Sequence, residues 1–425
     1  MNEMAARHRR VLGDGAPLFY RDPLELVRGE GVWLYAADGS RYLDLYNNVP
    51  CVGHGNPRVA KAVADQMATL NVHSRYLHPV VLDYGERLLA RHHARIESLV
   101  MACSGTEALE IALMTARTAT GHRGIICTDA TYHGNSAEVS RMNALPVGTE
   151  RPGFRSVSTP QRFRPLLAEA ADDELLAAHL DQLGATIAGL KASDEGFAGM
   201  VVCSILANEG LPDPPAGWFR EASALVRSEG GLVIADEVQA GFARSGRWWG
   251  YETSGFEPDI VCLGKPMGNG LPVSAVAASY DLISRFREGH RYFNTFASSP
   301  VQAAAANAVL DEIVDRNLMA SVASVGQYLR EGLHRLQVEH PAMGDVRGHG
   351  LFIGVDWVSP GTTEPDPAGA GAVVEALKQR HMLVGVSGQF NNVVKIRPPL
   401  VLEREHADLF LAALAEAAND RAESR

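Results

Sequence analysis

The sequence predicts an α/β fold built on a central sheet of buried parallel or mixed strands. The first observation is a set of short runs rich in β-branched residues and apolar on both faces, which lie at residues 124–129, 200–204, 232–236, 260–264 and 273–279. These runs alternate with helical stretches, and the C-terminal part changes to a separate strand-and-helix pattern. A chain of 425 residues also exceeds the usual size of one core, so we expect a large domain and a smaller one.

The elements of the large domain follow from local patterns. The segment GVWLYAADGSRYLDLY (31–46) places an Asp-Gly pair between two strand-like runs and predicts a hairpin. A helix is expected from Thr106 to Arg117, and an Ala-rich, acidic surface helix at about 173–190. Residues 143–165 are rich in Pro, Arg and Gly and are predicted to form a long loop, which in a compact domain is often functional.

The C-terminal part combines helices and strands. One long helical stretch is expected over 300–339, followed by strands in GLFIGVDWV, MLVGV and VVKIRPPL and by a last helix over 406–419. This pattern predicts a small α+β domain. We expect an N-terminal segment 1–50 that packs with the small domain, a large domain over 51–315, and the small domain over 316–425.

Composition excludes several classes of partner. The net charge of −11 argues against a nucleic-acid surface or an anionic membrane, since both would repel an acidic protein. No signal peptide and no membrane-length apolar stretch is found, so we expect a cytoplasmic protein. The five cysteines are scattered, mostly within apolar runs, and are predicted to be buried free thiols; without a CxxC pair or a Cys/His cluster, no metal is expected.

A carboxylate and an amine end two neighbouring predicted strands. The run LVIADEVQAGFARSG ends its strand at Asp236, and DIVCLGKPMGNG ends the next at Lys265. Alone, a strand-end Asp is usually a cap and a Lys in a Gly-rich loop is usually solvated. Together, at the carboxyl ends of strands where α/β folds build their sites, they match pyridoxal 5′-phosphate chemistry. That chemistry needs a lysine amine for the cofactor aldehyde and a carboxylate for the pyridine nitrogen.

Two further motifs belong to the same predicted site. In CSGTEAL, residues Ser104, Gly105 and Thr106 stand before a helix, so free backbone N–H groups, hydroxyls and the positive helix end converge as in a phosphate cup. A plain N-cap is the simpler interpretation of these three residues alone. In TYHG, Tyr132 follows a strand and could stack on an aromatic cofactor, although a surface tyrosine is the simpler alternative.

Together these four motifs resemble the class III, or subgroup II, aminotransferases of the fold-type I pyridoxal-phosphate enzymes, from about Phe19 to Asn419. The resemblance implies a large domain with a mostly parallel, mixed sheet. It implies that Lys265 forms a Schiff base with the cofactor and shuttles protons.

The other cofactor residues carried over from the family are Asp236 at the pyridine nitrogen, Tyr132 as the stacking ring, Ser104, Gly105 and Thr106 at the phosphate, Val238 on the opposite ring face, and Gln239 or His133 on the 3′-oxygen side. By the same resemblance, Thr295 in YFNTFASSP reaches the phosphate of a neighbouring subunit. The resemblance therefore implies a homodimer with shared active sites, and it leaves the pairing of dimers into tetramers open.

Within the family, the segments DLYNNVPCVGHGNP, SRYLH, GDVRGHGLFIGVD and NNVVKIRPPL resemble the branch of ethanolamine-phosphate phospho-lyase and alanine–glyoxylate aminotransferase. Three departures from the common pattern stand out. Cys203 and Asn208 replace two family glutamates, with Glu209 one position further on; Lys395 replaces the carboxylate-binding arginine; and Ala297-Ser298-Ser299-Pro300 replaces G-G-N-P. The first two disfavour 2-oxoglutarate as acceptor and favour pyruvate or glyoxylate.

The sequence leaves the reaction open. Arg75, Lys395 and Arg397 are candidate cations for an anionic substrate group, with surface solvation as the alternative for each. The preferred prediction is transamination from a primary amine or ω-amino compound to a small 2-oxo acid. The alternative is β-elimination of ammonia and phosphate from a phosphorylated amino alcohol such as phosphoethanolamine. A catalytically inactive dimeric binding module is disfavoured, because Lys265 and Asp236 are both present.

Overall fold

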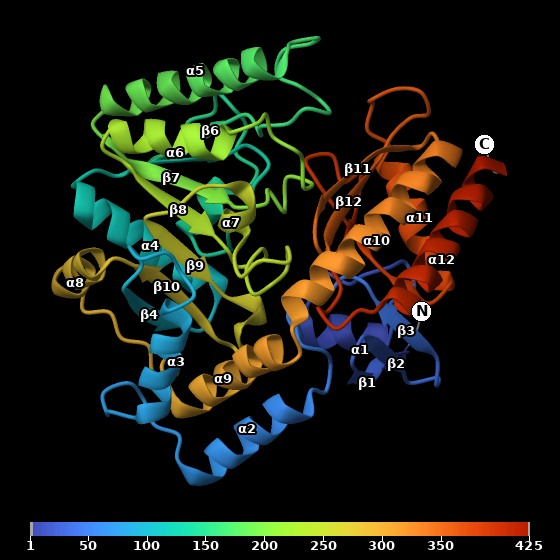
Figure 1. Cartoon of the computed structure of the whole chain (residues 1–425), viewed down its shortest axis with the longest axis horizontal. Helices are drawn as coiled ribbons and strands as arrows, with labels where there is room; N and C mark the ends of the chain where they lie inside the picture. The colour runs from blue at the N-terminus through green and yellow to red at the C-terminus, as the bar shows by residue number, and fades with distance from the viewer. Residues whose placement is uncertain (1–2, 424–425) are drawn as a thin grey trace.

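The computed structural model describes residues 3–423 and is organised around three sheets. The largest has seven strands in the order β4-β10-β9-β8-β7-β5-β6 and lies at the centre of the larger part of the molecule (Figure 1). Its strands are β4 (Ser98–Ala102), β5 (Gly124–Thr128), β6 (Phe154–Val157), β7 (Phe197–Cys203), β8 (Leu232–Asp236), β9 (Ile260–Leu263) and β10 (Ser274–Ala278).

The central sheet is mixed and mostly parallel, as expected. Strands β5 to β9 pair in parallel, and β10 runs antiparallel to both of its neighbours, β4 and β9. Strands β4, β5, β7, β8 and β9 therefore all end at the same edge. The prediction of a continuous loop over 143–165 was wrong, because Phe154–Val157 pairs with β5 as the edge strand β6 and buries Phe154.

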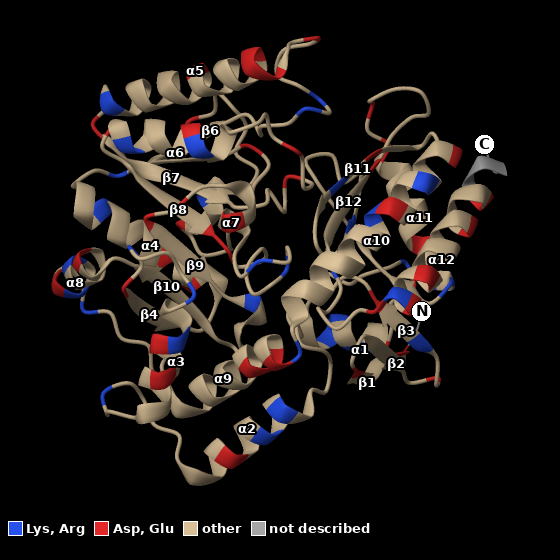
Figure 2. Cartoon of the chain, in the orientation of Figure 1, with Lys and Arg blue, Asp and Glu red and all other residues tan. Residues whose placement is uncertain are grey.

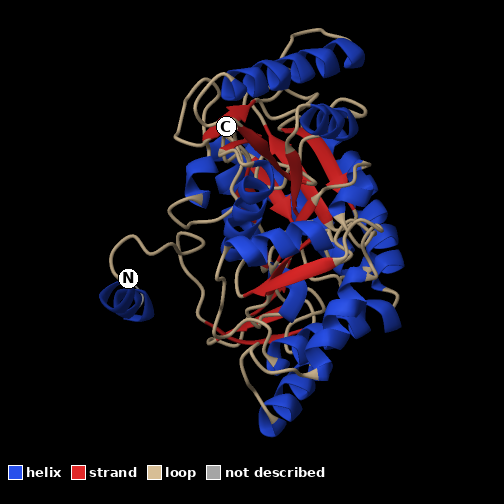
Figure 3. Ribbon diagram, turned by 90° about the vertical axis from the view of Figure 1, so that its left-hand side faces the viewer, coloured by secondary structure: helices blue, strands red, loops and turns tan. Residues whose placement is uncertain are grey.

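Both faces of the central sheet are buried, which explains the apolar runs of its strands. On β5, Ile125 and Cys127 belong to one core cluster and Ile126 to another. One face packs on α4 (Gly105–Thr120), and the other lies towards α5 (Asp172–Lys191) and α6 (Trp218–Ser228). Figure 3 shows helices on both sides of the strands. This covering is what a parallel sheet requires.

The remaining helices frame the sheets. They are α1 (Glu3–Leu12), α2 (Pro57–Thr69), α3 (Pro79–Leu89), η1 (Val139–Met142), α7 (Gly250–Ser254), η2 (Lys265–Gly268), α8 (Tyr280–Gly289), α9 (Pro300–Asp315), α10 (Leu318–Glu339), α11 (Pro367–Gln379) and α12 (Arg404–Glu423). Helix α1 stands apart from the body of the chain (Figure 3) and has no buried residue. The stretch 300–339 is two helices rather than one, because Asn317 adopts a left-handed conformation with φ of 50°.

Two four-stranded sheets build the smaller part of the molecule. One is the antiparallel set β11 (Met343–His349), β12 (Phe352–Trp357), β15 (Val393–Ile396) and β14 (Gly385–Ser387); the other joins β1 (Leu26–Glu30), β2 (Trp33–Ala36) and β3 (Arg41–Asp44) to β13 (Met382–Leu383). The pairing of β13 with β3 links the N-terminal segment to the C-terminal part. The predicted hairpin is β2–β3. The domain boundaries after residues 50 and 315 stay a prediction.

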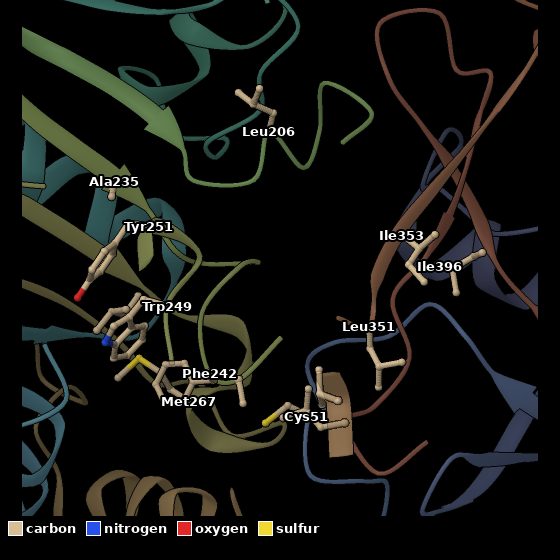
Figure 4. Packing of buried hydrophobic residues seen from close by; sticks show 14 of the residues in the cluster. Cys51, Leu206, Ala235, Phe242, Trp249, Tyr251, Met267, Leu351, Ile353 and Ile396 are labelled. Atoms are coloured by element: carbon tan, nitrogen blue, oxygen red, sulfur yellow. The ribbon is translucent and has the colours of Figure 1, made fainter. Parts of the chain in front are cut away.

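One apolar cluster connects the larger and smaller parts. Phe242 and Trp249 of the larger part belong to the same cluster as Cys51, Leu351 and Ile353 (Figure 4). Figure 2 shows charged residues of both signs along the outlying helices α2 and α5. Within residues 3–423 every helix is too short or too polar to span a bilayer.

Asp356 on β12 is a buried electrostatic link between the two parts. Its carboxylate accepts two hydrogen bonds from Arg164 at 2.6 and 2.9 Å, one from Arg347 at 2.8 Å and one from Asn392 at 2.6 Å. Arg347 also donates to the carbonyl of Gly210. Burial opposes ionisation of Asp356, but the hydrogen bonds and charges of the two arginines outweigh it and lower the pKa of this carboxyl.

Replacing Asp356 by Asn should lower the free energy of unfolding at pH 7 by about 3 kcal/mol, because the partly buried Arg164 loses its counter-charge and the buried Arg347 keeps only Asp345. The lowered pKa stabilises the fold above the usual aspartate range, and this stabilisation is lost as the pH falls through the folded-state pKa. The difference between wild type and variant in urea unfolding should therefore shrink below about pH 4. The exposed Asp65→Asn is the control; a pH-independent difference would contradict the electrostatic role.

Candidate active site

The predicted site residues come together at the edge where five strands of the central sheet end. Ser104, Gly105 and Thr106 follow β4, Tyr132 and His133 follow β5, Asn208 and Glu209 follow β7, Asp236, Val238 and Gln239 follow β8, and Lys265 follows β9. Parallel strands bring their carboxyl ends to one edge, so segments far apart in sequence meet there.

Asp236 is a buried carboxylate held at both oxygens. Its Oδ1 accepts the backbone N–H of Val238 at 3.0 Å, and its Oδ2 is 2.7 Å from Nδ1 of His133. A carboxylate accepts, so Nδ1 carries the proton, and Nε2 of His133 then accepts the hydroxyl of Thr131 at 2.8 Å. These contacts fix the orientation of the Asp236 carboxylate.

Lys265 begins the turn η2, directly after β9. Burial lowers the pKa of its amine, and the positive charge of Arg397 lowers it further, while the negative charge of Asp236 opposes the shift. The amine therefore lies within electrostatic reach of both charges. A lysine with a lowered pKa is a better base and nucleophile near neutral pH.

Val238 packs between Gly105 and Gly264, where its side chain leaves little or no room for a Cβ. A Cβ at Gly105 would lie 2.9 Å from Cγ1 of Val238, and a Cβ at Gly264 would lie 3.4 Å from the same atom. The two glycine backbones are also close to each other: that Gly264 Cβ would lie 3.5 Å from Cα of Gly105. The N-terminus of α4, the end of β9 and the Val238 side chain thus form one tight cradle beside Lys265.

The N-terminus of α4 is the predicted phosphate cup. Ser104 is the N-cap, and its hydroxyl accepts the N–H of Glu107. Thr106 exchanges weak hydrogen bonds with Asn135 at 3.3 and 3.4 Å. Gly134 has φ of +151°, and a Cβ there would lie 2.5 Å from Oγ1 of Thr106. The loop that carries Tyr132 and His133 therefore approaches the helix end closely, leaving backbone N–H groups and hydroxyls around one point.

Glu107 ties a distant segment to this helix end. Its carboxylate accepts hydrogen bonds from Tyr292 at 2.6 Å, Asn294 at 2.7 Å and the N–H of Cys103 at 2.9 Å. Thr295 follows directly and is exposed on the surface of the chain. Sequence patterns do not reveal this anchor, because Glu107 has the pattern of an ordinary acid in the first turn of a helix.

An amide network borders the site on the side of the smaller sheets. Asn208 donates to the carbonyl of Tyr132 at 2.8 Å and accepts from Gln239 at 3.0 Å. The Oε1 of Gln239 accepts from Arg397, which also donates to the carbonyl of Tyr46 at 3.0 Å. Gln239 and His133 thus both have protein partners, and their assignment to the 3′-oxygen side stays a prediction. Tyr132 itself is 47% exposed.

The three candidate cations lie in two places. Lys395 lies on β15, Arg397 directly follows this strand, and both side chains are buried. The charges of Arg397 and Lys265 both act on Lys395, so the three groups share one neighbourhood. Arg75 is exposed and lies over the ring of Phe293 at 4.1 Å, next to the Thr295 segment. Within one chain, the site therefore collects two of the three cations.

The residues present fit pyridoxal phosphate. The cup at α4 suits a phosphate, the buried and hydrogen-bonded Asp236 suits a protonated ring nitrogen, and the buried amine of Lys265 suits the aldehyde. The cradle of Gly105, Gly264 and Val238 would press on one face of a flat ring. Sequence reasoning missed the positioning contacts of Glu107 and Asn208, and also the bond between His133 and Asp236.

Comparison with known proteins agrees with this geometry. The family model described as "Aminotransferase class-III" matches residues 20–418. The chain is 37% identical to the alanine–glyoxylate aminotransferase 2-like protein of Drosophila melanogaster, covering 95% of this chain and 84% of the relative. It is 33% identical to ethanolamine-phosphate phospho-lyase homolog 1 of Caenorhabditis elegans, covering 94% and 89%.

Among solved structures, the chain is similar to a phospholyase from Arthrobacter in complex with phosphoethanolamine. The sequences are 41% identical, the TM-score is 0.94, and the match covers 98% of this chain and 99% of the other.

Replacing Asp236 by Asn should leave the cofactor bound but reduce turnover of the amine substrate by several orders of magnitude. The neutral amide cannot hold a proton on the ring nitrogen, and an unprotonated ring is a poor acceptor of electrons. The visible absorbance of the purified protein reports the bound cofactor, and steady-state kinetics report turnover. A variant with near-normal turnover would show that Asp236 does not have this role.

Proposed function

The chain belongs to the class III aminotransferase family of pyridoxal-phosphate enzymes, and on this basis we propose that it is a phospho-lyase that releases ammonia and inorganic phosphate from a phosphorylated amino alcohol such as phosphoethanolamine. The family and its fold confirm the expectations from the sequence. The proposal reverses the order of the two reactions that the sequence alone had favoured.

One observation carries the proposal: Lys395 and Arg397 are buried beside Lys265 without a carboxylate partner. Within residues 3–423 neither of them forms an ion pair; Lys395 contacts the hydroxyl of Ser387, and Arg397 contacts the oxygens of Gln239 and Tyr46. Buried charges are normally paired. Two buried basic groups without a carboxylate partner are therefore suited to a ligand with two negative charges, such as a phosphate monoester.

The carboxylates whose charges act on the pair, Asp44 and Glu209, are engaged elsewhere. Asp44 contacts Nε2 of His54 at 2.6 Å and accepts the N–H of Tyr46 at 3.0 Å. Glu209 accepts the hydroxyl of Thr128 at 2.6 Å and the N–H of Asn208 at 3.0 Å. A carboxylate that paired with Arg397 would neutralise its charge. In this chain the side chain that accepts from Arg397 is the uncharged Gln239. The similarity to the phospholyase in complex with phosphoethanolamine also supports a phosphorylated amine as substrate.

The residues of the site have separate tasks in the elimination. When bound, pyridoxal phosphate takes up the electrons left at the amine-bearing carbon of the substrate. Lys265 removes the proton from that carbon, since its lowered pKa leaves a fraction of the amine free. Asp236 keeps the proton on the ring nitrogen.

The bond between the neighbouring carbon and the phosphate oxygen then breaks, and the phosphate leaves with the electron pair. Lys395 and Arg397 stabilise the negative charge of the leaving group. Water finally replaces nitrogen at the carbon, so that phosphoethanolamine and water yield acetaldehyde, ammonia and phosphate.

Transamination to a small 2-oxo acid is the second candidate. The similarity to the alanine–glyoxylate aminotransferase 2-like protein favours it. In that reaction Lys265 would return the proton to the cofactor instead of allowing a group to leave. A carboxylate would then occupy the place of the phosphate, with Arg397 as its partner.

Incubation with phosphoethanolamine and no 2-oxo acid should release phosphate and acetaldehyde in equal amounts over many turnovers. Lys265→Ala should abolish both products, because the amine that removes the proton is lost. Malachite-green phosphate measurement and an aldehyde assay check this outcome. Transfer of nitrogen from amines to pyruvate or glyoxylate, without phosphate release, would instead establish the transaminase.

We also propose a homodimer in which Thr295 serves the partner's site. The same region of the surface exposes several large apolar side chains, namely Met67, Leu70, Tyr76, Leu77, Leu82, Phe293 and Phe296, of which Leu77 is 94% exposed. A cavity of about 710 Å³ lies beside them and is lined by Met67, His73, Thr295 and Phe296. An apolar surface of this kind is expected to be covered by another protein surface.

Mixed dimers test the shared site. In a heterodimer of one Lys265→Ala chain and one Thr295→Val chain, a Thr295 that crosses the interface leaves one site with both residues intact. That site should bind pyridoxal phosphate as tightly as wild type, whereas the Thr295→Val homodimer should bind about 10-fold more weakly after losing a hydrogen bond to a charged group. If both dimers bind equally weakly, Thr295 acts in its own chain.

A further inference from the structure

The amine of Lys395 is almost completely buried and poorly satisfied. Lys395 lies on β15 with 3% of its surface exposed. Its Nζ lies 3.4 Å from Oγ of Ser387, at the long limit of a hydrogen bond, and 5.7 Å from the centre of the Phe352 ring. An ammonium group has three protons to donate, so this environment satisfies the charged form badly.

The charges around Lys395 are mostly positive. Arg397 directly follows β15, and Lys265 begins η2; the charges of both lower the pKa of Lys395. From the segment at the end of β7, Cys203 and Glu209 act in the opposite direction. Burial of Cys203 raises the pKa of its thiol well above the ordinary value, so the thiol carries no charge at neutral pH.

The strands on the other side of Lys395 add no free negative charge. Lys395 pairs with Gly354 on β12, and Gly354 pairs with Arg347 on β11. Two positions along β12, Asp356 is already bound by Arg164 and Arg347. On β14, Ser387 contributes only its hydroxyl.

Burial and the surrounding positive charge both favour the neutral amine of Lys395. Burial is the larger cause of the lowered pKa of Lys395, and the charge of Arg397 is the next. A negative charge placed beside Nζ would reverse this balance, because it would attract the ammonium form and supply the hydrogen-bond acceptors that the site lacks.

We propose that Lys395 is a neutral amine in the free holoenzyme and takes up a proton from solvent when a dianion binds beside Arg397, so that it selects dianionic groups over monoanionic ones. This inference rests on the proposed function, since it concerns the place of the substrate phosphate. Arg397 alone can neutralise a carboxylate. A phosphate or sulfate brings a second negative charge, and the proton on Lys395 balances it.

Sulfate is the appropriate probe, because it is a dianion throughout the neutral range and brings no proton of its own. The cofactor phosphate already fills the cup at α4 in the holoenzyme. Isothermal titration of the holoenzyme with sulfate, in buffers of different ionisation enthalpy, measures the protons taken up. We expect about one proton per sulfate near neutral pH.

The affinity for sulfate should depend on pH because of the same proton. Where the free amine is neutral and the complexed amine is charged, the sulfate affinity falls about tenfold for each unit that the pH rises. Acetate, a monoanion, should bind more weakly and without proton uptake.

Three variants separate the charge of Lys395 from its shape. Lys395→Met should take up no proton and bind sulfate about 10- to 100-fold more weakly, because a charge-assisted hydrogen bond is lost. Lys395→Arg is always protonated and should bind sulfate without proton uptake. The matched control is Lys191→Met on α5, an exposed lysine paired with Glu229, which should behave as wild type.

Each outcome decides the inference. Sulfate binding without proton uptake by the wild-type holoenzyme, or unchanged uptake in Lys395→Met, would overturn it, as would a failure to bind sulfate. These results leave the phosphate-release assay to judge the reaction separately. Proton uptake by an enzyme that releases no phosphate from phosphoethanolamine would support the anion site and refute the lyase.

Discussion

The direction of five strands is the constraint on which the site depends. Because β4, β5, β7, β8 and β9 all end at one edge of the central sheet, a helix N-terminus, a histidine, a carboxylate and a lysine meet although more than a third of the chain separates Ser104 from Lys265. Parallel strands need both faces covered, and the two core clusters on either side of β5 provide that cover. The rigid sheet then places each side chain at the end of a buried element, where its backbone cannot move far.

The site concentrates positive charge in a protein that is acidic as a whole. Within residues 3–423 Lys395 and Arg397 are buried and form no ion pair; they hydrogen-bond only with Ser387, Gln239 and the carbonyl of Tyr46. Such uncompensated groups destabilise the free protein, and the ligands remove the deficit when they bind. The charges of Asp236 and Arg397 both act on the amine of Lys265, so the groups proposed for the ring nitrogen and for the anion share one neighbourhood. Asp356 is the contrasting case, a buried carboxylate whose partners are complete without any ligand.

Local patterns predicted much of the fold. The hairpin at Asp38-Gly39, the strand that ends at Asp236 and the helix after Ser104 were all predicted, since turn residues, apolar runs and caps act within a few neighbours. The predictions were wrong where distant contacts decide. Strand β6 forms because its backbone pairs with β5 and Phe154 is buried in the core. The break between α9 and α10 follows from the left-handed conformation of Asn317, which helical periodicity does not reveal.

For the site, the sequence by itself determined which groups are present: an amine at Lys265, a carboxylate at Asp236, hydroxyls at Ser104 and Thr106, and cations at Lys395 and Arg397. Residue types and the spacing of strand ends suffice for that, because they are properties of short segments. Only the tertiary structure decided that His133 binds Asp236, that Glu107 anchors the Thr295 segment, and that Gln239 rather than a carboxylate meets Arg397. The burial and charge pairing of each group depend on residues from many positions in the chain. They are therefore set only when the sheet has formed and brought these residues together.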